Sequence, residues 1–235
     1  MSEDPIKLFG SRADRLPQAD DGDRVAETTK RLIGHMPLVN IVADIVVPQF
    51  WVSALDRRRD EWLKDLADVV DRLCDRFENI ATDEAFISAS IKASRIAVAT
   101  HQQEKREYLR NALLNIGMGK GPDEVRQQIF FNAVEAFSPA HVKTLDVIWR
   151  GAGRVRWDDR GVPIPRRNYG AAVEILVPEL KGQPTLIEAV FTDLRTRGFS
   201  TLAKGDAPFP QGGLMANLGI EFLRFVLSPD DISRK

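Results

Sequence analysis

The residue types that most enzymes use for chemistry are few and scattered in this chain. His35, His101 and His141 are its only histidines, and none has a second histidine three or four residues away. That spacing is what places two histidine ligands for a metal ion on one face of a helix. The single cysteine, Cys74, lies between two aspartates, whose negative charge opposes formation of the reactive thiolate. We therefore expect no catalytic, cofactor-binding or metal-binding residues, and a protein that is not an enzyme.

A glycine-rich loop precedes one of the expected helices and invites comparison with phosphate-binding loops. Gly117, Gly119 and Gly121 supply flexible backbone, and N–H groups at a helix N-terminus attract anions. The GxxxxGK[ST] spacing is absent, however, and the loop follows a helix instead of a strand. In addition, Asp123 and Glu124 put negative charge where a phosphate would bind. The sequence predicts a simple turn between two helices here.

Arginine and aromatic residues are concentrated between residues 150 and 169. Six arginines and two aspartates lie in residues 150–167, a local net charge of +4. Guanidinium groups bind phosphates and aromatic rings stack on bases, so this segment fits a nucleic acid. An exposed loop that contacts a protein partner has the same composition. Together with two arginines further along, the candidate contact residues are Arg150, Arg154, Arg156, Trp157, Arg160, Arg166, Arg167, Tyr169, Arg195 and Arg197.

The helix expected in the recognition position argues against direct reading of bases. Helix 185–197 carries Glu188 and Asp193, and its two arginines come only at its end. Acidic side chains in a recognition helix repel the phosphate backbone beside the groove. We therefore expect a protein partner, with nucleic acid as the alternative. A homo-oligomer is compatible with either partner.

An apolar segment followed by three arginines raises the question of membrane contact. Apolar and aromatic side chains at 38–51 fit the headgroup boundary of a bilayer, and the arginines fit anionic lipid. Packing of the same segment in the core is the competing interpretation. Asp44 and Pro48 interrupt the apolar run, so no membrane-spanning helix is expected. The residues concerned are Val47, Phe50, Trp51, Arg57, Arg58 and Arg59.

The composition as a whole is that of a folded globular protein. The chain has 235 residues, 43% of them hydrophobic and 29% charged, with a formal net charge of −1. A balanced charge gives no global attraction to nucleic acid or to an anionic membrane. One cysteine rules out an intrachain disulfide framework and fits the cytoplasm. Residues 1–24 are polar, without the features of a secretory signal, and we expect a flexible tail.

Hydrophobic spacing predicts a helical domain at 25–150, followed by a smaller module. Apolar residues recur at the helical spacing of three or four, and Ser138-Pro139 has the form of a helix start. The helices expected before residue 150 cover residues 25–33, 38–47, 51–77, 82–98, 104–116, 122–137 and 139–149. Glycines and prolines then mark 151–167 as a linker or exposed loop.

The segment 168–235 has the element order of a winged-helix-like module. Two helices separated by a turn come first, then two short strands around a glycine- and proline-rich tip, and then a last helix. The expected bounds are 171–180 and 185–197 for the helices, 199–203 and 213–216 for the strands, and 218–227 for the last helix. The predicted fold is therefore mainly α, with a small α+β module at the C-terminal end.

Two segments of this sequence are similar to a group of bacterial proteins. Residues 110–115 (RNALLN) lead to 122–124 (PDE) and to the stretch 129–145, and residues 218–223 read LGIEFL. Together they resemble uncharacterised bacterial proteins that include the abortive-infection alpha group, in which a helical region precedes a winged-helix-like part. The resemblance implies this arrangement and a role in phage defence. It carries no catalytic or ligand-binding residues, and the arginine-rich segment is not part of its pattern.

These observations predict a non-catalytic bacterial regulatory protein that acts through protein–protein contacts. The first alternative is a DNA-binding winged-helix regulator, which rests on the element order and on the arginine-rich segment. The second is a membrane-associated defence effector, which rests on the apolar segment 38–51.

Overall fold

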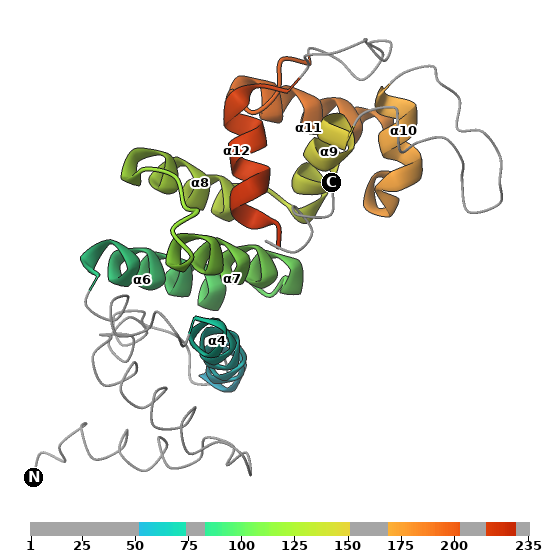
Figure 1. The fold of residues 1–235 in the computed structure, drawn as a ribbon. Helices are drawn as coiled ribbons and strands as arrows, with labels where there is room; N and C mark the ends of the chain where they lie inside the picture. Colours follow the sequence, from blue (N-terminus) through green and yellow to red (C-terminus); the bar gives the residue numbers. More distant parts are fainter. Residues whose placement is uncertain (1–51, 74–82, 151–168, 203–214, 229–235) are drawn as a thin grey trace, which may run out of the picture. The chain divides into compact units, whose positions relative to one another are not determined.

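The computed structural model describes residues 52–73, 83–150, 169–202 and 215–228 of the chain. These residues are predominantly helical and include no named β-strand, so the described part of the protein is mainly α, as predicted (Figure 1). Its elements are α4 (Val52–Arg72), α6 (Glu84–Ala99), α7 (Gln103–Gly117), α8 (Glu124–Ala136), α9 (Pro139–Arg150), α10 (Tyr169–Leu176), the 3-10 helix η3 (Pro178–Leu180), α11 (Pro184–Thr196) and α12 (Asn217–Val226).

Several helix ends are set by residues whose side chain or backbone suits the position. The Asp123 carboxylate accepts a hydrogen bond of 3.0 Å from the backbone N–H of Arg126 and so caps α8, which lies within the helix predicted at 122–137. Asp83 caps the start of α6 in the same way at 2.9 Å, while Thr82, the first residue of the helix predicted at 82–98, lies outside the described residues. Helix α11 ends just before Gly198, whose φ of +80° is easily reached by glycine.

Helices α4, α6 and α7 pack against one another (Figure 1). Trp62 of α4 is 1% exposed, and its indole N–H donates to the Ser94 hydroxyl of α6 at 2.8 Å. The Ser94 hydroxyl donates in turn to the Ser90 carbonyl at 2.7 Å, so the polar groups of the Trp62 and Ser94 side chains are satisfied. Small residues on α6 allow close approach of the neighbouring helices. They are Ala89, Ser90, Ala93, Ser94 and Ala97, all buried.

An aromatic core joins α8, α12 and the segments that follow α8 and α11. Its rings meet mainly edge to face, the favoured geometry for aromatic pairs. The Phe137 and Phe199 ring centroids are 5.2 Å apart, and those of Phe130 and Phe222 are 5.6 Å apart. The members, each no more than 2% exposed, are Phe130, Phe131, Phe137, Phe199, Phe222 and Phe225.

The described helices on the two sides of residues 151–168 share this core. They belong to one compact unit, residues 47–235, in which α12 packs on α7 and α9 packs on α10 and α11. The predicted boundary at 151–167 and the predicted tail at 1–24 both lie outside the described residues, so these divisions stay predictions.

The helix predicted at 171–180 is in fact two elements. Helix α10 ends at Leu176, and a separate 3-10 turn follows at Pro178. Proline has no backbone N–H to donate into the preceding helical turn, and its ring clashes with the carbonyl four residues earlier. The proline at this position is therefore the sequence signal for the break that the prediction of one continuous helix overlooked.

The two strands predicted at 199–203 and 213–216 are not formed in the described part of the chain. There, a single antiparallel bridge pairs Ser200 with Met215. The Ser200 hydroxyl accepts a hydrogen bond of 3.0 Å from the Leu202 backbone N–H, a local bond of the kind that competes with the hydrogen bonds of a strand ladder. No winged-helix hairpin is therefore seen within the described residues, and the predicted tip falls in 203–214, outside them.

Candidate functional site

Most of the arginine-rich segment lies outside the described residues. This applies to Arg154, Arg156, Trp157, Arg160, Arg166 and Arg167. Arg150 is the last residue of α9, and Tyr169 is the first of α10. Tyr169 is only 4% exposed, and burial raises the pKa of its hydroxyl. Its ring packs inside the protein, where no base can stack on it.

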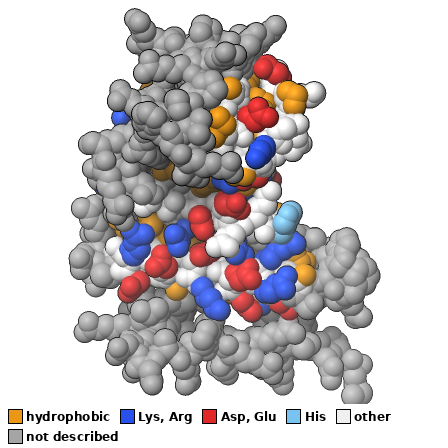
Figure 2. All heavy atoms as spheres, turned by 90° about the vertical axis from the view of Figure 1, so that its right-hand side faces the viewer, with side chains coloured by type: hydrophobic (Ala, Val, Ile, Leu, Met, Phe, Trp, Pro, Cys, Tyr) orange, Lys and Arg blue, Asp and Glu red, His pale blue; other side chains and the backbone are white. Residues whose placement is uncertain are grey.

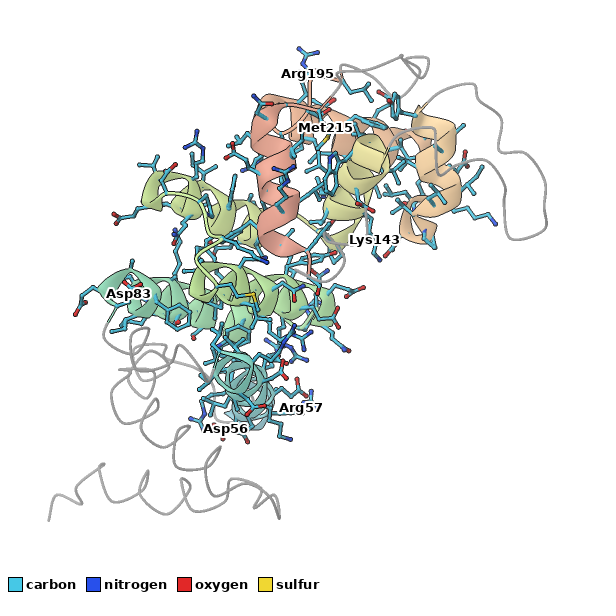
Figure 3. The ribbon with its side chains drawn as sticks, in the orientation of Figure 1. Asp56, Arg57, Asp83, Lys143, Arg195 and Met215 are labelled. Carbon is cyan, nitrogen blue, oxygen red and sulfur yellow. The ribbon has the colours of Figure 1, made fainter. Side chains whose placement is uncertain are left out.

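The two arginines at the end of α11 differ in their surroundings. Arg197 pairs with Asp193 at 2.8 Å, and its guanidinium lies over the Phe137 ring at 5.5 Å from the centroid. Arg195 is exposed and extends outward from the end of the helix (Figure 3). Arg197 therefore has a structural environment of its own, and Arg195 directs its charge toward solvent.

The residues considered for membrane contact are divided between described and undescribed parts. Val47, Phe50 and Trp51 lie outside the described residues. Arg57 pairs with Glu61 at 4.0 Å, and Arg59 lies 3.5 Å from Asp56 and 3.9 Å from Asp60; Arg58 is half-buried in the same helix. Among the described helices, none combines the length and the apolar composition that crossing a bilayer requires.

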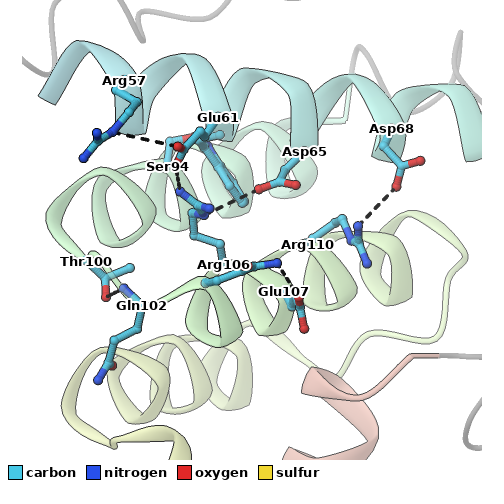
Figure 4. Close-up of polar contacts among 12 residues, drawn as sticks. Arg57, Glu61, Asp65, Asp68, Ser94, Thr100, Gln102, Arg106, Glu107 and Arg110 are labelled. Atoms are coloured by element: carbon cyan, nitrogen blue, oxygen red, sulfur yellow. Dashed lines mark hydrogen bonds and ion pairs between the residues drawn. The ribbon is translucent and has the colours of Figure 1, made fainter. Parts of the chain in front are cut away.

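A row of ion pairs joins α4 to α7 (Figure 4). Arg106, half-buried, binds the Glu61 carboxylate and lies 3.8 Å from the Asp65 carboxylate, and Arg110 lies 3.8 Å from Asp68. The hydrogen bond from Arg106 lowers the pKa of Glu61, whereas burial raises the pKa of Asp65 in spite of the neighbouring arginines. These pairs lie between α4 and α7, and contact between the two helices accounts for them without a ligand.

Acidic and basic side chains are interspersed over the described part of the face shown in Figure 2. Binding to a nucleic-acid backbone depends on positive charge gathered along one surface. On this face the described side chains do not provide such a surface, because each group of cations is accompanied by acids.

The most connected polar cluster surrounds His141 at the start of α9. The His141 Nδ1 atom accepts a hydrogen bond from the Ser138 backbone N–H at 3.2 Å and lies 2.8 Å from the Ser138 hydroxyl. Its Nε2 atom lies 3.5 Å from an Asp193 carboxylate oxygen of α11. The imidazole is stacked on the Phe137 ring, with centroids 5.0 Å apart. We call Phe137, Ser138, His141 and Asp193 the α9 junction.

Serine, histidine and aspartate also carry acyl transfer in serine hydrolases, but a structural role explains all contacts of the α9 junction. Ser138 is the residue before α9, and His141 is the third residue of that helix. A side chain at this position that accepts from the N-cap backbone N–H forms a capping box, usually with Glu or Gln. From the sequence, His141 was interpreted as a histidine without a partner. The helix start at Ser138-Pro139 nevertheless placed it third in α9, where a side chain can close a capping box.

Two asparagines of α7 form a second buried polar cluster, which sequence reasoning missed. The Asn115 amide donates to the carbonyls of Arg224, Phe225 and Leu227 at 3.0–3.2 Å, and the Asn111 amide donates to the Val226 carbonyl at 3.1 Å. The last carbonyls of a helix have no partner within it, so these amides satisfy the end of α12. The sequence signal for this cluster was the spacing of Asn111 and Asn115, which are four residues apart on one face of the helix and are separated only by apolar residues.

Large aliphatic side chains are exposed on two groups of helices. Ile175 and Leu176 of α10 and Leu186 of α11 are 42%, 43% and 44% exposed. On α8, Val125 is 70% exposed and Ile129 is 40% exposed. Exposed apolar side chains on neighbouring helices are more typical of a binding surface than single exposed aliphatic residues, which are ordinary. Helices α10 and α11 pack on each other, which favours them over α8 as the candidate surface.

Neither metal ligation nor similarity to known proteins assigns a chemistry to this chain. Within the residues that the structure describes, no group of three or more His, Cys, Asp or Glu side chains is arranged to hold a metal ion. Comparisons with protein families, with curated proteins and with solved structures found no match.

Proposed function

We propose that the protein is a non-catalytic regulator that acts by binding another protein through α10 and α11. The observation that carries this proposal is the exposure of Ile175, Leu176 and Leu186, each above 40%, on two helices that pack together. Burial of such side chains under a partner removes apolar surface from water, which drives most protein association. A partner with a complementary apolar surface fits these helices.

The charges beside the aliphatic residues support a protein partner over a nucleic acid. Glu174, Glu179 and Glu188 are exposed on α10, η3 and α11, and Lys181 is exposed between the last two of these elements. Exposed acids oppose approach of a phosphate backbone. The basic residues lie at the far end of α11. Arg195 is exposed there, and Arg197, at the C-cap, is paired with Asp193.

Leu186→Glu is expected to lower partner capture about tenfold or more and to leave the fold intact. Leu186 is the third residue of α11, a position where a carboxylate favours the helix, while the charge would be buried unpaired under a partner. The measurement is affinity capture from cells with quantitative mass spectrometry, alongside a thermal melt. Val125→Glu on α8 is the matched control, because it places the same charge on another exposed aliphatic residue. Equal capture by Leu186→Glu and the parent protein would contradict the proposal.

The setting that we propose for this binding is phage defence in the bacterial cytoplasm. It is supported by the resemblance of residues 110–115, 122–124, 129–145 and 218–223 to the abortive-infection alpha group and by the single cysteine of the chain. The order α10, η3, α11, bridge, α12 supports a winged-helix-like classification of the C-terminal part.

DNA binding is the second candidate function, and one observation favours it. The antiparallel bridge between Ser200 and Met215 follows α11 at the point where a winged helix begins its wing. Under this proposal, affinity for labelled duplex DNA falls log-linearly with salt, and Ala at Arg154, Arg156, Arg166 and Arg167 makes the slope shallower by about 0.9 for each phosphate that the variant no longer binds. Arg57→Ala on α4 serves as the control. No binding at low salt would remove this candidate.

A further inference from the structure

We propose that the α9 junction is a pH-sensitive clasp at the start of α9, closed while neutral His141 accepts the Ser138 backbone N–H and opened when the ring is protonated. The inference concerns the free protein and does not depend on the proposed function. It rests on which nitrogen of His141 accepts a hydrogen bond and on the charged groups that face the ring.

The hydrogen bonds fix the tautomer of the neutral imidazole. A backbone N–H can only donate, so the bond from Ser138 N–H requires an unprotonated Nδ1 atom. The proton of the neutral ring is then on Nε2, where it points to the Asp193 carboxylate at 3.5 Å. The Ser138 hydroxyl, 2.8 Å from the same Nδ1 atom, donates to it as well. Protonation of Nδ1 would set a ring N–H against the Ser138 N–H and remove the acceptor of the capping box.

The surroundings of His141 resist its protonation. Burial lowers its pKa below the ordinary 6.5, and the positive charges of Arg197 on the α11 side and Lys105 of α7 act in the same direction. Asp193 is the facing group that opposes them, and its carboxylate is shared with Arg197 at 2.8 Å. The ring also packs flat on Phe137, itself 1% exposed in the aromatic core.

The sign of the pH effect follows from this lowered pKa. Above pH 6.5 the ring is neutral in both the folded and the unfolded chain, and the clasp contributes fully. Below pH 6.5 the unfolded chain binds a proton that the folded chain does not bind, so stability falls as the pH falls toward the folded pKa. At pH 5.5 one such histidine lowers the folding equilibrium constant by up to about tenfold.

His141→Gln tests the clasp, because glutamine keeps a capping-box acceptor and does not titrate. Urea denaturation at pH 7.5 and 5.5 should show that the parent protein loses more stability on acidification than His141→Gln does, by up to about tenfold in the equilibrium constant. His101→Gln, at an exposed histidine ahead of α7, is the matched control and should behave as the parent. Equal losses for the parent and His141→Gln would overturn the proposal.

A second measurement uses the unaltered protein and stands even if a variant does not fold. The NMR titration of the His141 ring should show a midpoint below 6.5, with the proton of the neutral ring on Nε2. Amide hydrogen exchange in the first turn of α9 should accelerate along the same titration, since the capping box opens as the ring is protonated. A His141 midpoint at or above 6.5, or a proton on Nδ1, would refute the clasp.

Discussion

Gly219→Ala is expected to destabilise the protein by about 2–4 kcal/mol. A Cβ atom at this position would lie 2.0 Å from the Phe199 carbonyl oxygen, 3.0 Å from the Phe199 carbonyl carbon and 3.1 Å from the Met215 methyl. The nearest obstacle is backbone, which cannot turn aside as a side chain can. Relief requires α12 to move away from the bridge segment, and with it Phe222, which packs edge to face on Phe199 at 5.0 Å.

Gly117→Ala provides the control for Gly219→Ala, measured by urea denaturation followed by circular dichroism. Its Cβ atom would lie 2.4 Å from a terminal methyl of Leu73, a flexible group that can rotate away. Alanine also favours a helix over glycine by about 1 kcal/mol, which offsets part of the strain in either variant. We expect Gly117→Ala to stay within about 1 kcal/mol of the parent. Equal stability of the two variants would mean that α12 does not rest on the Phe199 backbone.

Local sequence patterns were sufficient to predict most helices because their ends depend on neighbouring residues. The cap at Asp123, the start at Ser138-Pro139 and the stop at Gly198 each act within four residues along the chain. Each is a backbone or side-chain preference that does not require the rest of the fold. These are the parts of a fold that a single sequence can reveal.

The close contacts that hold the helices together depend on residues far apart in the sequence, and the predictions missed them. Asn115 donates to carbonyls at the end of α12, 109 to 112 residues later in the sequence. Gly219 lies against the backbone of Phe199, which precedes the segment 203–214. His141 meets Asp193 through the packing of α9 on α11. A glycine within a predicted helix, such as Gly219 in the first turn of the helix predicted at 218–227, is a signal of such close approach, but it does not identify the partner.

Asn115→Asp is expected to be the most destabilising near-isosteric change in the described core, by about 3–5 kcal/mol at pH 7. Asn115 is 2% exposed, and its amide nitrogen faces three carbonyl oxygens at the end of α12. A carboxylate there replaces the donor with a negative charge that faces those oxygens and the negative end of the helix dipole. Loss of the donor also leaves buried carbonyls without a partner.

Asn132→Asp on the exposed face of α8 is the control for Asn115→Asp. It makes the same chemical change without burial and should shift stability by no more than about 0.5 kcal/mol.

The pH dependence of stability separates the effect of charge from that of shape in Asn115→Asp. The folded state raises the pKa of a carboxyl at position 115, because burial and the carbonyls disfavour its charged form. The folded variant then binds a proton more tightly than the unfolded chain, so its stability falls as pH rises above about 3.9. The loss of folding stability relative to the parent should therefore become smaller between pH 7 and pH 5. A loss that does not change with pH would mean that the carboxylate reaches water and that α12 has moved away from α7.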